Sequence, residues 1–261
     1  MKAYKVCMTI AGSDPSGGAG IQADLKTFHR HGCYGQAVIT ALTVQNSLGV
    51  SACHDVDSDL IEVQIANVMD DLMPDAVKIG MVGSAAAVDA IATCIEHFKP
   101  GFVVLDPIIF SSSGYPLTDE ETARRMLDRL APLCHLLTPN LPEARYIARR
   151  PHETDAHLLL ASLRERFPRL SILLKGGHGE GAPTDYLLPS DGKVISFEGK
   201  HISSANTHGT GCVLSSAITA NMANGMPLAQ AVGKAKAFVE QAIMKGSGYY
   251  AGKGHGALYL L

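Results

Sequence analysis

Short runs of apolar residues alternate along the chain with longer segments in which apolar residues recur at every third or fourth position. The short runs predict buried strands, because parallel strands that are covered on both faces consist almost entirely of apolar residues. They lie at residues 6–10, 37–40, 76–79, 102–105, 136–138 and 171–175. The alternation predicts an α/β fold with a mostly parallel central sheet flanked by helices.

The longer segments have the spacing of amphipathic helices that bury one face. They cover residues 21–31, 60–72, 85–98, 119–130, 212–224 and 228–245, and a further helix ends at residues 160–167. Thr118 and Glu121 have the spacing of a capping box before the fourth of these helices. Gly225 and Gly246 predict the ends of the last two.

One domain accounts for the whole pattern. A chain of 261 residues is short enough for a single large α/β domain, and neither a linker-like stretch nor an internal repeat divides it. Near the carboxyl-terminal half, the turn sequence Pro-Ser-Asp-Gly at 189–192 separates two short apolar runs, which predicts a β-hairpin. We therefore expect one domain over residues 1–261.

Charge and cysteine content exclude several classes of protein. The chain has 22 Lys and Arg against 25 Asp and Glu, a net charge of −3, whereas a nucleic-acid-binding surface needs a basic stripe. No apolar run approaches the roughly 18 residues of a membrane-spanning helix. The six cysteines are scattered and have no metal-ligand spacing with the histidines. We expect a cytoplasmic protein with reduced thiols that binds neither nucleic acid nor a membrane.

The abundant glycines, 26 in all, include a cluster after the first predicted strand. Residues 12–20 read GSDPSGGAG and open the first predicted helix. Glycines allow the backbone to approach a bound ligand closely, although a tight strand-to-helix turn would need them too. The segment lacks the ending of a Walker A loop and does not fit the dinucleotide fingerprint Gly-x-Gly-x-x-Gly.

A second glycine cluster, ANTHGTGC at residues 205–212, precedes the penultimate predicted helix. A helix N-terminus offers unpaired N–H groups and a positive dipole end, which suit an anion. An ordinary N-cap formed by Thr210 explains the same pattern. Cys212 lies in the first turn, where we expect the helix to lower the pKa of its thiol, whereas most lone cysteines are small buried apolar residues.

Polar residues also follow other predicted strands at their carboxyl ends, where ligands bind in sheets of this kind. Asp106 can reach a metal or a ligand there, and Lys175 lies beside two glycines and can contact phosphate. Asn140 and Glu143 have the spacing of an N-cap and its partner, so a purely structural role stays open. Together these residues are the parts needed to transfer a phosphoryl group from a magnesium nucleotide to a small alcohol.

In this order, the motifs resemble the hydroxymethylpyrimidine/phosphomethylpyrimidine kinase family of thiamine biosynthesis, within the ribokinase-like superfamily. The matching segments are residues 11–27, 39–50, 78–81, 106–107, 138–144, 175–178 and 207–212. The resemblance implies a ribokinase-like fold and ATP-dependent phosphorylation of 4-amino-5-hydroxymethyl-2-methylpyrimidine and then of its monophosphate. It implies ATP and Mg²⁺ as cofactors and leaves room for a monovalent cation. We also expect a homodimer.

The resemblance implies which residues bind the substrate. Gln45 would hydrogen-bond the pyrimidine in a pocket lined by Gly12, Ala19, Val44 and Met81. An amide suits an aminopyrimidine because it carries both a donor and an acceptor. A glutamine satisfied by the backbone is the structural alternative.

The resemblance also implies roles on the phosphate side. Asp106 and Glu143 would organise Mg²⁺ and its waters. The nucleotide phosphates would contact Asn140, Lys175, Thr207, His208 and Thr210. The catalytic set would be Cys212 as base, Lys175 as the neutralising cation, and the backbone of Gly209 and Gly211 as an anion hole. Most ribokinase-like enzymes carry Asp at the position of Cys212.

One segment departs from the family pattern, and two other functions stay open. After Asp106-Pro107 the family commonly has an Ala-Lys pair in a flap, whereas residues 108–114 here read IIFSSSG, with a bulky Phe110 and no basic residue. A pyridoxal or pyridoxine kinase is the nearest alternative, because its substrate is also a flat methylated ring with a hydroxymethyl group. A sensor without turnover is the alternative from another class.

Overall fold

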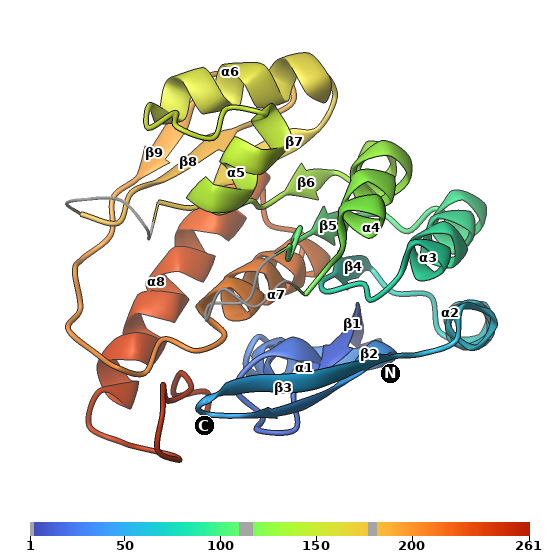
Figure 1. The fold of residues 1–261 in the computed structure, drawn as a ribbon, viewed down its shortest axis with the longest axis horizontal. Coiled ribbons are helices and arrows are strands. Elements are labelled where there is room, and N and C mark those ends of the chain that lie inside the picture. Colours follow the sequence, from blue (N-terminus) through green and yellow to red (C-terminus); the bar gives the residue numbers. More distant parts are fainter. Residues whose placement is uncertain (1–2, 110–116, 177–181) are drawn as a thin grey trace.

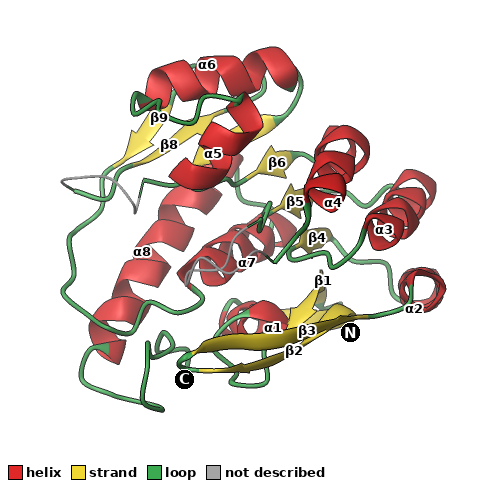
Figure 2. Ribbon diagram, viewed as in Figure 1, coloured by secondary structure: helices red, strands yellow, loops and turns green. Residues whose placement is uncertain are grey.

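Nine strands among the described residues form one sheet, which lies between two layers of helices in the computed structural model (Figures 1 and 2). The structure describes residues 3–109, 117–176 and 182–261. The strands are β1 Lys5–Ser13, β2 Cys33–Asn46, β3 Gly49–Asp55, β4 Ala76–Ile79, β5 Val103–Leu105, β6 Leu136–Leu137, β7 Ser171–Leu174, β8 Asp185–Leu188 and β9 Ile195–Phe197. Their order is β3-β2-β1-β4-β5-β6-β7-β8-β9. The strands from β2 to β7 in this order are parallel, and β3, β8 and β9 add antiparallel edges.

The helices bury one face each against the sheet. One layer holds α1 Gly20–Arg30, α7 Thr210–Ala223 and α8 Leu228–Gly246. The other holds α2 Ser58–Asp71, α3 Ala85–Phe98, α4 Glu120–Arg125, α5 Leu141–Ala148 and α6 Ala156–Arg166. A π-helical turn, Met126–Leu130, and a short 3-10 helix, Ala131–Leu133, continue α4. Because both faces are covered, the central strands are almost wholly buried, as their apolar sequences predict.

The predicted α/β architecture is confirmed, and one strand was not predicted. Residues 37–40 form only the middle of β2, which extends far enough to pair with β3 as an antiparallel ribbon. Most residues of β3 are half-buried or exposed. An edge strand whose residues are at most half-buried does not need an apolar run, so the hydrophobic pattern gives no signal for it.

The predicted capping box before α4 is wrong by one residue. Asp119 is the N-cap, and its side chain accepts a hydrogen bond from the N–H of Thr122 at 2.7 Å. Thr118 instead donates its hydroxyl to the carbonyl of Ile108 at 3.0 Å. Aspartate and threonine both cap helices well, and here the preceding loop has already engaged the threonine.

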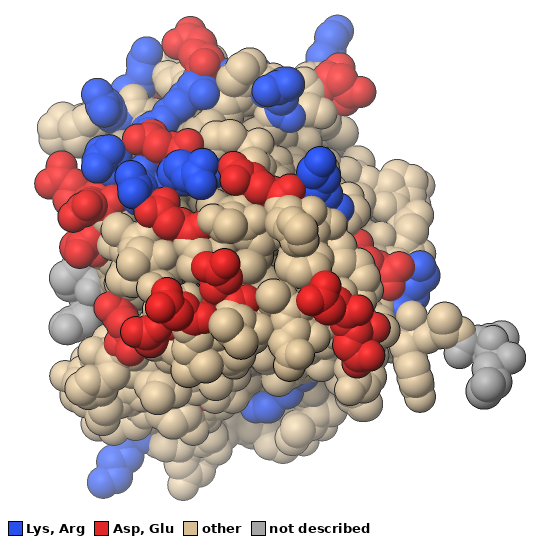
Figure 3. All heavy atoms as spheres, turned by 90° about the vertical axis from the view of Figure 1, so that its right-hand side faces the viewer, with Lys and Arg blue, Asp and Glu red and all other residues tan. Residues whose placement is uncertain are grey.

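The surface beside α2, α3 and α4 carries basic and acidic side chains interspersed, with no broad basic area on this face (Figure 3). Several of them form ion pairs between helices: Arg125 with Asp89 at 2.6 Å, and Arg129 with Glu96 at 3.3 Å. Exposed pairs of this kind contribute little to stability. The two apolar layers therefore dominate the stability of the fold.

The structure bears on two expectations from the sequence, one about membrane-spanning helices and one about the cysteines. Among the described residues, no helix combines the length and the apolar character needed to cross a bilayer. All six cysteines are free thiols. Five of them are buried, and Cys53 is half-buried.

Candidate active site

The polar residues that follow the parallel strands meet at the carboxyl edge of the sheet. The loops after β6 and β7 are joined there by a hydrogen bond from the N–H of Lys175 to the carbonyl of Pro139 at 2.9 Å. Asp106 follows β5 directly, and its N–H bonds to the carbonyl of Ile79 at the end of β4. The sheet thus brings residues from four separate segments to one edge, as expected for a ligand site.

The two glycine clusters lie against each other. Gly209 has a φ of +82°, and a Cβ there would overlap the carbonyl oxygen of Gly18. A Cβ on Gly18 would in turn overlap the His208 ring. Both loops therefore need glycine, one for its backbone conformation and one for its close approach.

The N-terminus of α7 is open to an anion. Gly209 is the N-cap, and no side chain of the described residues caps this helix. Thr210 lies in the first helical position, where its hydroxyl donates to the carbonyl of Thr207 at 2.7 Å, so the alternative in which Thr210 is the N-cap is wrong. Among the described residues, the N–H of Thr210 bonds to the carbonyl of Thr207 at 3.3 Å, which leaves the N–H groups of Gly211 and Cys212 for a ligand. The positive end of the helix dipole favours an anion there.

Lys175 and Asp106 form an ion pair beside this helix start, with Nζ and Oδ1 2.7 Å apart. Asp106 also accepts hydrogen bonds from Thr138 at 3.0 Å and Ser215 at 3.1 Å. Burial alone would raise the pKa of Asp106, but the ammonium groups of Lys175 and Lys78 hold it below its usual range. A Cβ on Gly211 would stand 3.4 Å from Lys175 Nζ, so the open helix end lies against the pair.

Glu143 and Asn140 form the capping box of α5 that their spacing predicts. The Asn140 side chain accepts from the N–H of Glu143 at 2.9 Å, and Glu143 accepts from the N–H of Asn140 at 2.8 Å. Glu143 is 2% exposed. Burial raises the pKa of Glu143 to about 7, with nearby Asp106 adding to the rise and Lys175 opposing it. The structural role is therefore present, and any role toward magnesium would be added to it.

The fit of these carboxylates to magnesium depends on the nucleotide. Within residues 3–109, 117–176 and 182–261, no group of three or more His, Cys, Asp or Glu side chains could hold a metal ion. Both oxygens of Asp106 already accept hydrogen bonds. Mg²⁺, however, keeps several waters and needs only one or two carboxylates when phosphates supply the other ligands. Asp106 and Glu143 fit a magnesium nucleotide and do not form a cation cage by themselves.

Cys212 lies in the first turn of α7 and is 9% exposed. The expectation that its pKa is lowered is wrong. Burial raises the pKa of the Cys212 thiol, and the favourable effects of the Lys78 ammonium and the Gly20 N–H do not compensate. Burial of a thiolate away from water raises the thiol pKa by more than the positive end of one helix lowers it.

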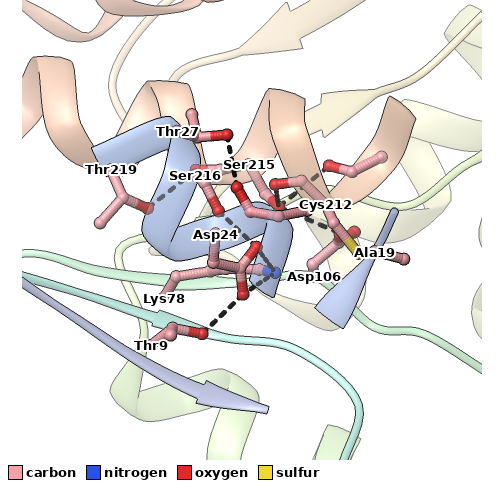
Figure 4. Close-up of polar contacts among 12 residues, drawn as sticks. Thr9, Ala19, Asp24, Thr27, Lys78, Asp106, Cys212, Ser215, Ser216 and Thr219 are labelled. Atoms are coloured by element: carbon pink, nitrogen blue, oxygen red, sulfur yellow. Dashed lines mark hydrogen bonds and ion pairs between the residues drawn. The ribbon is translucent and has the colours of Figure 1, made fainter. Parts of the chain in front are cut away.

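A fully buried ion pair, Lys78 with Asp24, lies beneath the site and was not predicted (Figure 4). Lys78 Nζ is 2.6 and 2.7 Å from the two carboxylate oxygens, and the hydroxyls of Thr9 and Ser216 each donate to Asp24 at 2.6 Å. Burial would lower the pKa of Lys78, but Asp24 raises it above its ordinary value, with Cys212 and Asp106 adding to the rise. A single lysine within the apolar strand β4 is the sequence signal that could have found this pair.

The residues expected to bind the substrate lie at the ends of β1, β2 and β4, except Ala19, which is the N-cap of α1. Met81 packs on Gly12, where a Cβ would be 2.9 Å from the Met81 methyl group. Gln45 in β2 lies 3.2 Å from His208 Nε2 and 3.2 Å from Thr43 Oγ1. Val44 is 52% exposed, so its side chain is not enclosed in a pocket.

Asp14 is a site residue that the sequence did not single out. Its carboxylate lies 2.9 Å from His208 Nε2 and accepts from the N–H of Ala19 at 2.8 Å. Burial would raise the pKa of Asp14, but hydrogen bonds from His208 and Ser16 lower it to about 2. The side chain of His208, expected to bind the nucleotide, is thus engaged near Gln45, and its backbone N–H donates to the carbonyl of Gly256 at 3.1 Å.

Part of the expected site lies outside the described residues. These parts are residues 110–116, which include most of the flap sequence with Phe110, and residues 177–181, which include the second glycine after Lys175. The departure of the flap from the family pattern stays an observation on the sequence.

Comparisons with known proteins agree over almost the whole chain. The family described as phosphomethylpyrimidine kinase matches residues 14–259. The hydroxymethylpyrimidine/phosphomethylpyrimidine kinase of Rhizobium meliloti is 39% identical over 257 residues, covering 97% of this chain and 96% of the relative. The crystal structure of phosphomethylpyrimidine kinase from Clostridium difficile 630 is 39% identical with a TM-score of 0.81, covering 91% of this chain and 98% of that one. The pyridoxal kinase from Staphylococcus aureus in complex with AMP-PCP is 27% identical with a TM-score of 0.89, covering 99% and 94%.

Proposed function

Since the chain belongs to the phosphomethylpyrimidine kinase family, we propose that it transfers the terminal phosphoryl group of ATP to 4-amino-5-hydroxymethyl-2-methylpyrimidine and then to the resulting monophosphate. The observation that carries the proposal is the convergence of three groups. The uncapped start of α7, the Lys175–Asp106 pair and Cys212 lie together where the parallel strands end. This is the arrangement that phosphoryl transfer needs, because its catalysis consists mainly of positioning and charge neutralisation.

The helix start and Lys175 handle the charge of the transferred group. The backbone N–H groups of Gly209 and Gly211 belong to the N-cap and first turn of α7, and we assign them to the transferred phosphoryl group as fixed hydrogen-bond donors. Lys175 adds a full positive charge next to them. Thr207 and His208 precede α7, Thr210 is its first residue, and Asn140 is the N-cap of α5. We assign the remaining phosphates to these four residues.

We assign to Cys212 the role of accepting the proton of the substrate hydroxyl. As the hydroxymethyl oxygen bonds to phosphorus, the bond from phosphorus to the ADP oxygen breaks and the hydroxyl proton passes to the Cys212 sulfur. Because burial raises the pKa of this thiol, only a small fraction is thiolate at neutral pH. A weakly populated base still suffices, since the loose transition state of phosphoryl transfer builds little charge on the attacking oxygen.

We assign the magnesium of the nucleotide to Asp106 and Glu143, which would hold it through waters and phosphate oxygens. When bound, the ion would neutralise phosphate charge. Lys175 keeps Asp106 ionised, and the capping box keeps Glu143 in place. A monovalent cation stays a prediction of the sequence alone.

We assign substrate reading to Gln45, with Gly12, Ala19 and Met81 around the ring and Val44 at the rim. The supporting observation is that Gln45 lies next to the His208 side chain, one residue before the N-cap of α7. A ring held by Gln45 would therefore lie close to the phosphoryl-binding helix start. Residues 1–261 would act as one kinase domain.

We propose a homodimer formed through the outer face of the β2–β3 ribbon. Three large apolar side chains are exposed there: Leu42 at 51%, Val44 at 52% and Leu48 at 68%. Exposed apolar groups clustered on one ribbon are typical of a protein interface. Sedimentation of Leu42→Glu should give a monomer, whereas Met244→Glu on α8 should sediment like the wild type. We also propose a cytoplasmic location, which the free thiols support.

The experiment that tests the proposed function is a comparison of magnesium-dependent ADP release with the pyrimidine and with pyridoxal. We expect a kcat/KM at least about tenfold higher with the pyrimidine, because discrimination between rings of similar shape rests on one or two hydrogen bonds. A higher value with pyridoxal would make the chain a pyridoxal kinase, the activity of a structural relative. Tight pyrimidine binding without ADP release would make it a sensor.

A further inference from the structure

One nitrogen atom of His208 contacts side chains from two other segments. His208 Nε2 lies 2.9 Å from Asp14 Oδ2 and 3.2 Å from Gln45 Nε2. Asp14 follows β1, Gln45 lies in β2, and His208 precedes α7. The side chains of His208 and Asp14 are 15% and 3% exposed, so water has little access to the contact between them.

Asp14 determines where the hydrogen of the His208 ring lies. Its carboxylate accepts the N–H groups of Ser16, Gly18 and Ala19 and the Ser16 hydroxyl. These bonds keep it ionised, and its pKa is lowered to about 2. An ionised carboxylate can only accept, so His208 must donate to it through a hydrogen on Nε2.

A hydrogen on Nε2 conflicts with the amide nitrogen of Gln45, since a protonated ring nitrogen has no lone pair to offer an NH₂ group. The other end of the amide has a matching conflict. Gln45 Oε1 lies 3.2 Å from Thr43 Oγ1, but the single Thr43 hydroxyl proton is directed to the carbonyl of Ser13 at the shorter distance of 2.8 Å. The amide nitrogen, a donor, therefore faces the N–H donor of His208, and the amide oxygen, an acceptor, faces the acceptor oxygen of Thr43.

Exchanging the amide nitrogen and oxygen of Gln45 removes both conflicts at once, because the two ends have nearly the same shape. Oε1 then takes the weaker, 3.2 Å branch of a bifurcated hydrogen bond from the single His208 Nε2–H, whose main acceptor is Asp14 at 2.9 Å. At the other end, Gln45 Nε2 donates to Thr43 Oγ1. We propose that the Asp14–His208 pair holds the Gln45 amide in this orientation and so sets which hydrogen-bonding edge of a substrate ring the pocket accepts. The inference rests on the proposed function, in which Gln45 reads the pyrimidine.

The substrate class follows from this orientation. A 4-aminopyrimidine presents a donor, its amino group, beside an acceptor, its ring nitrogen, and a carboxamide pairs with that order through its C=O and NH₂ groups. The 4-oxo analogue presents an acceptor beside a ring N–H, which is the reverse order. An amide that rotates freely can form both hydrogen bonds with either ring, whereas an amide fixed in one orientation can form both with only one of them. His208 is thus a specificity-determining positioning residue for 4-aminopyrimidines.

The test measures kcat/KM for the 4-amino and the 4-oxo pyrimidine in the wild type, His208→Gln and His208→Leu. A glutamine at position 208 has an NH₂ group that can donate to both the Asp14 carboxylate and the Gln45 amide oxygen, whereas leucine has no donor. A mismatched buried hydrogen bond changes the amino-to-oxo ratio by about 10- to 100-fold. We expect a ratio of that size in the wild type and His208→Gln, and a ratio within about threefold of unity in His208→Leu. General losses of rate or stability cancel in the ratio.

An unchanged ratio in His208→Leu would overturn the inference while leaving the kinase function intact. If the wild type phosphorylates neither ring, the proposed function and this inference fail together. A second measurement needs no variant: two-bond ¹H–¹⁵N correlation in the labelled wild type reports which ring nitrogen of His208 carries the hydrogen. We expect the hydrogen on Nε2, and a lone pair there would overturn the inference.

Discussion

Replacing Lys78 by methionine should destabilise the fold more than any exposed substitution of the same kind. Both partners of the Lys78–Asp24 pair are fully buried. Among the described residues, Lys78 Nζ donates only to Asp24, so Lys78→Met leaves a buried carboxylate with only the hydroxyls of Thr9 and Ser216. Breaking a buried pair from one side costs about 3–5 kcal/mol.

The double variant separates the ion pair from the packing around it. Asp24→Leu alone leaves a buried ammonium and should cost a similar 3–5 kcal/mol or so. Lys78→Met with Asp24→Leu removes both charges, and we expect a loss of only about 1–3 kcal/mol, because the Thr9 and Ser216 hydroxyls lose their acceptor. The coupling energy of the cycle should therefore be at least about 3 kcal/mol.

Urea unfolding measures these free energies. The chain contains no tryptophan, so far-UV circular dichroism and tyrosine fluorescence are the signals, and their transitions should coincide. Lys5→Met is the matched control, because Lys5 pairs with Asp75 at the surface and should leave the unfolding free energy unchanged within error. Single losses below about 1 kcal/mol, or additive single and double variants, would refute the reasoning.

Four further predictions concern the site itself. Cys212→Ala should slow phosphorylation of the alcohol about 10²- to 10³-fold and that of the monophosphate only a few-fold, because a phosphate acceptor is already ionised above pH 6 or so. Initial rates measured separately for the two steps check this. Equal losses in both steps would show that Cys212 is not the base. In the wild type, the rate of the first step should rise with pH above neutrality, since burial raises the pKa of this thiol, and a flat pH–rate profile would contradict that. Gly209→Ala should cost at least about 2 kcal/mol in urea unfolding, because φ is +82° and the new Cβ overlaps Gly18; wild-type stability would show that the loop contact is absent. The pKa of Asp14 is lowered to about 2 in the folded state, so the stability that its ionised carboxylate contributes is present above about pH 4 and is lost as the pH falls toward 2. Asp14→Asn should not show this loss of stability in acid unfolding. An acid transition equal to that of the wild type would show that Asp14 does not contribute.

The predictable parts of the fold are the elements whose burial is visible in their own short stretch of sequence. The parallel strands are covered on both faces, so each is an apolar run that can be recognised without its neighbours. Strand β3 is half-exposed and pairs through its backbone, which the hydrophobic pattern does not report. Asp106 and Lys175 were found because each directly follows such a run.

The parts of the site that were missed depend on contacts between distant positions. Lys78 lies 54 residues from Asp24, and His208 lies 194 residues from Asp14, so no local spacing marks either pair. The pKa of Cys212 was predicted with the wrong sign for the same reason. Its place in the first turn of α7 is visible in the sequence, but the depth of burial that raises the pKa is a property of the whole fold.

The most direct test of the central claim is the mass of the product formed from 4-amino-5-hydroxymethyl-2-methylpyrimidine, ATP and Mg²⁺ by the purified chain. We expect the pyrimidine to gain the mass of one HPO₃ group and then of a second, with one ADP formed for each. An unchanged pyrimidine, in a reaction where pyridoxal gains a phosphoryl group or where ATP stays intact, would contradict the account.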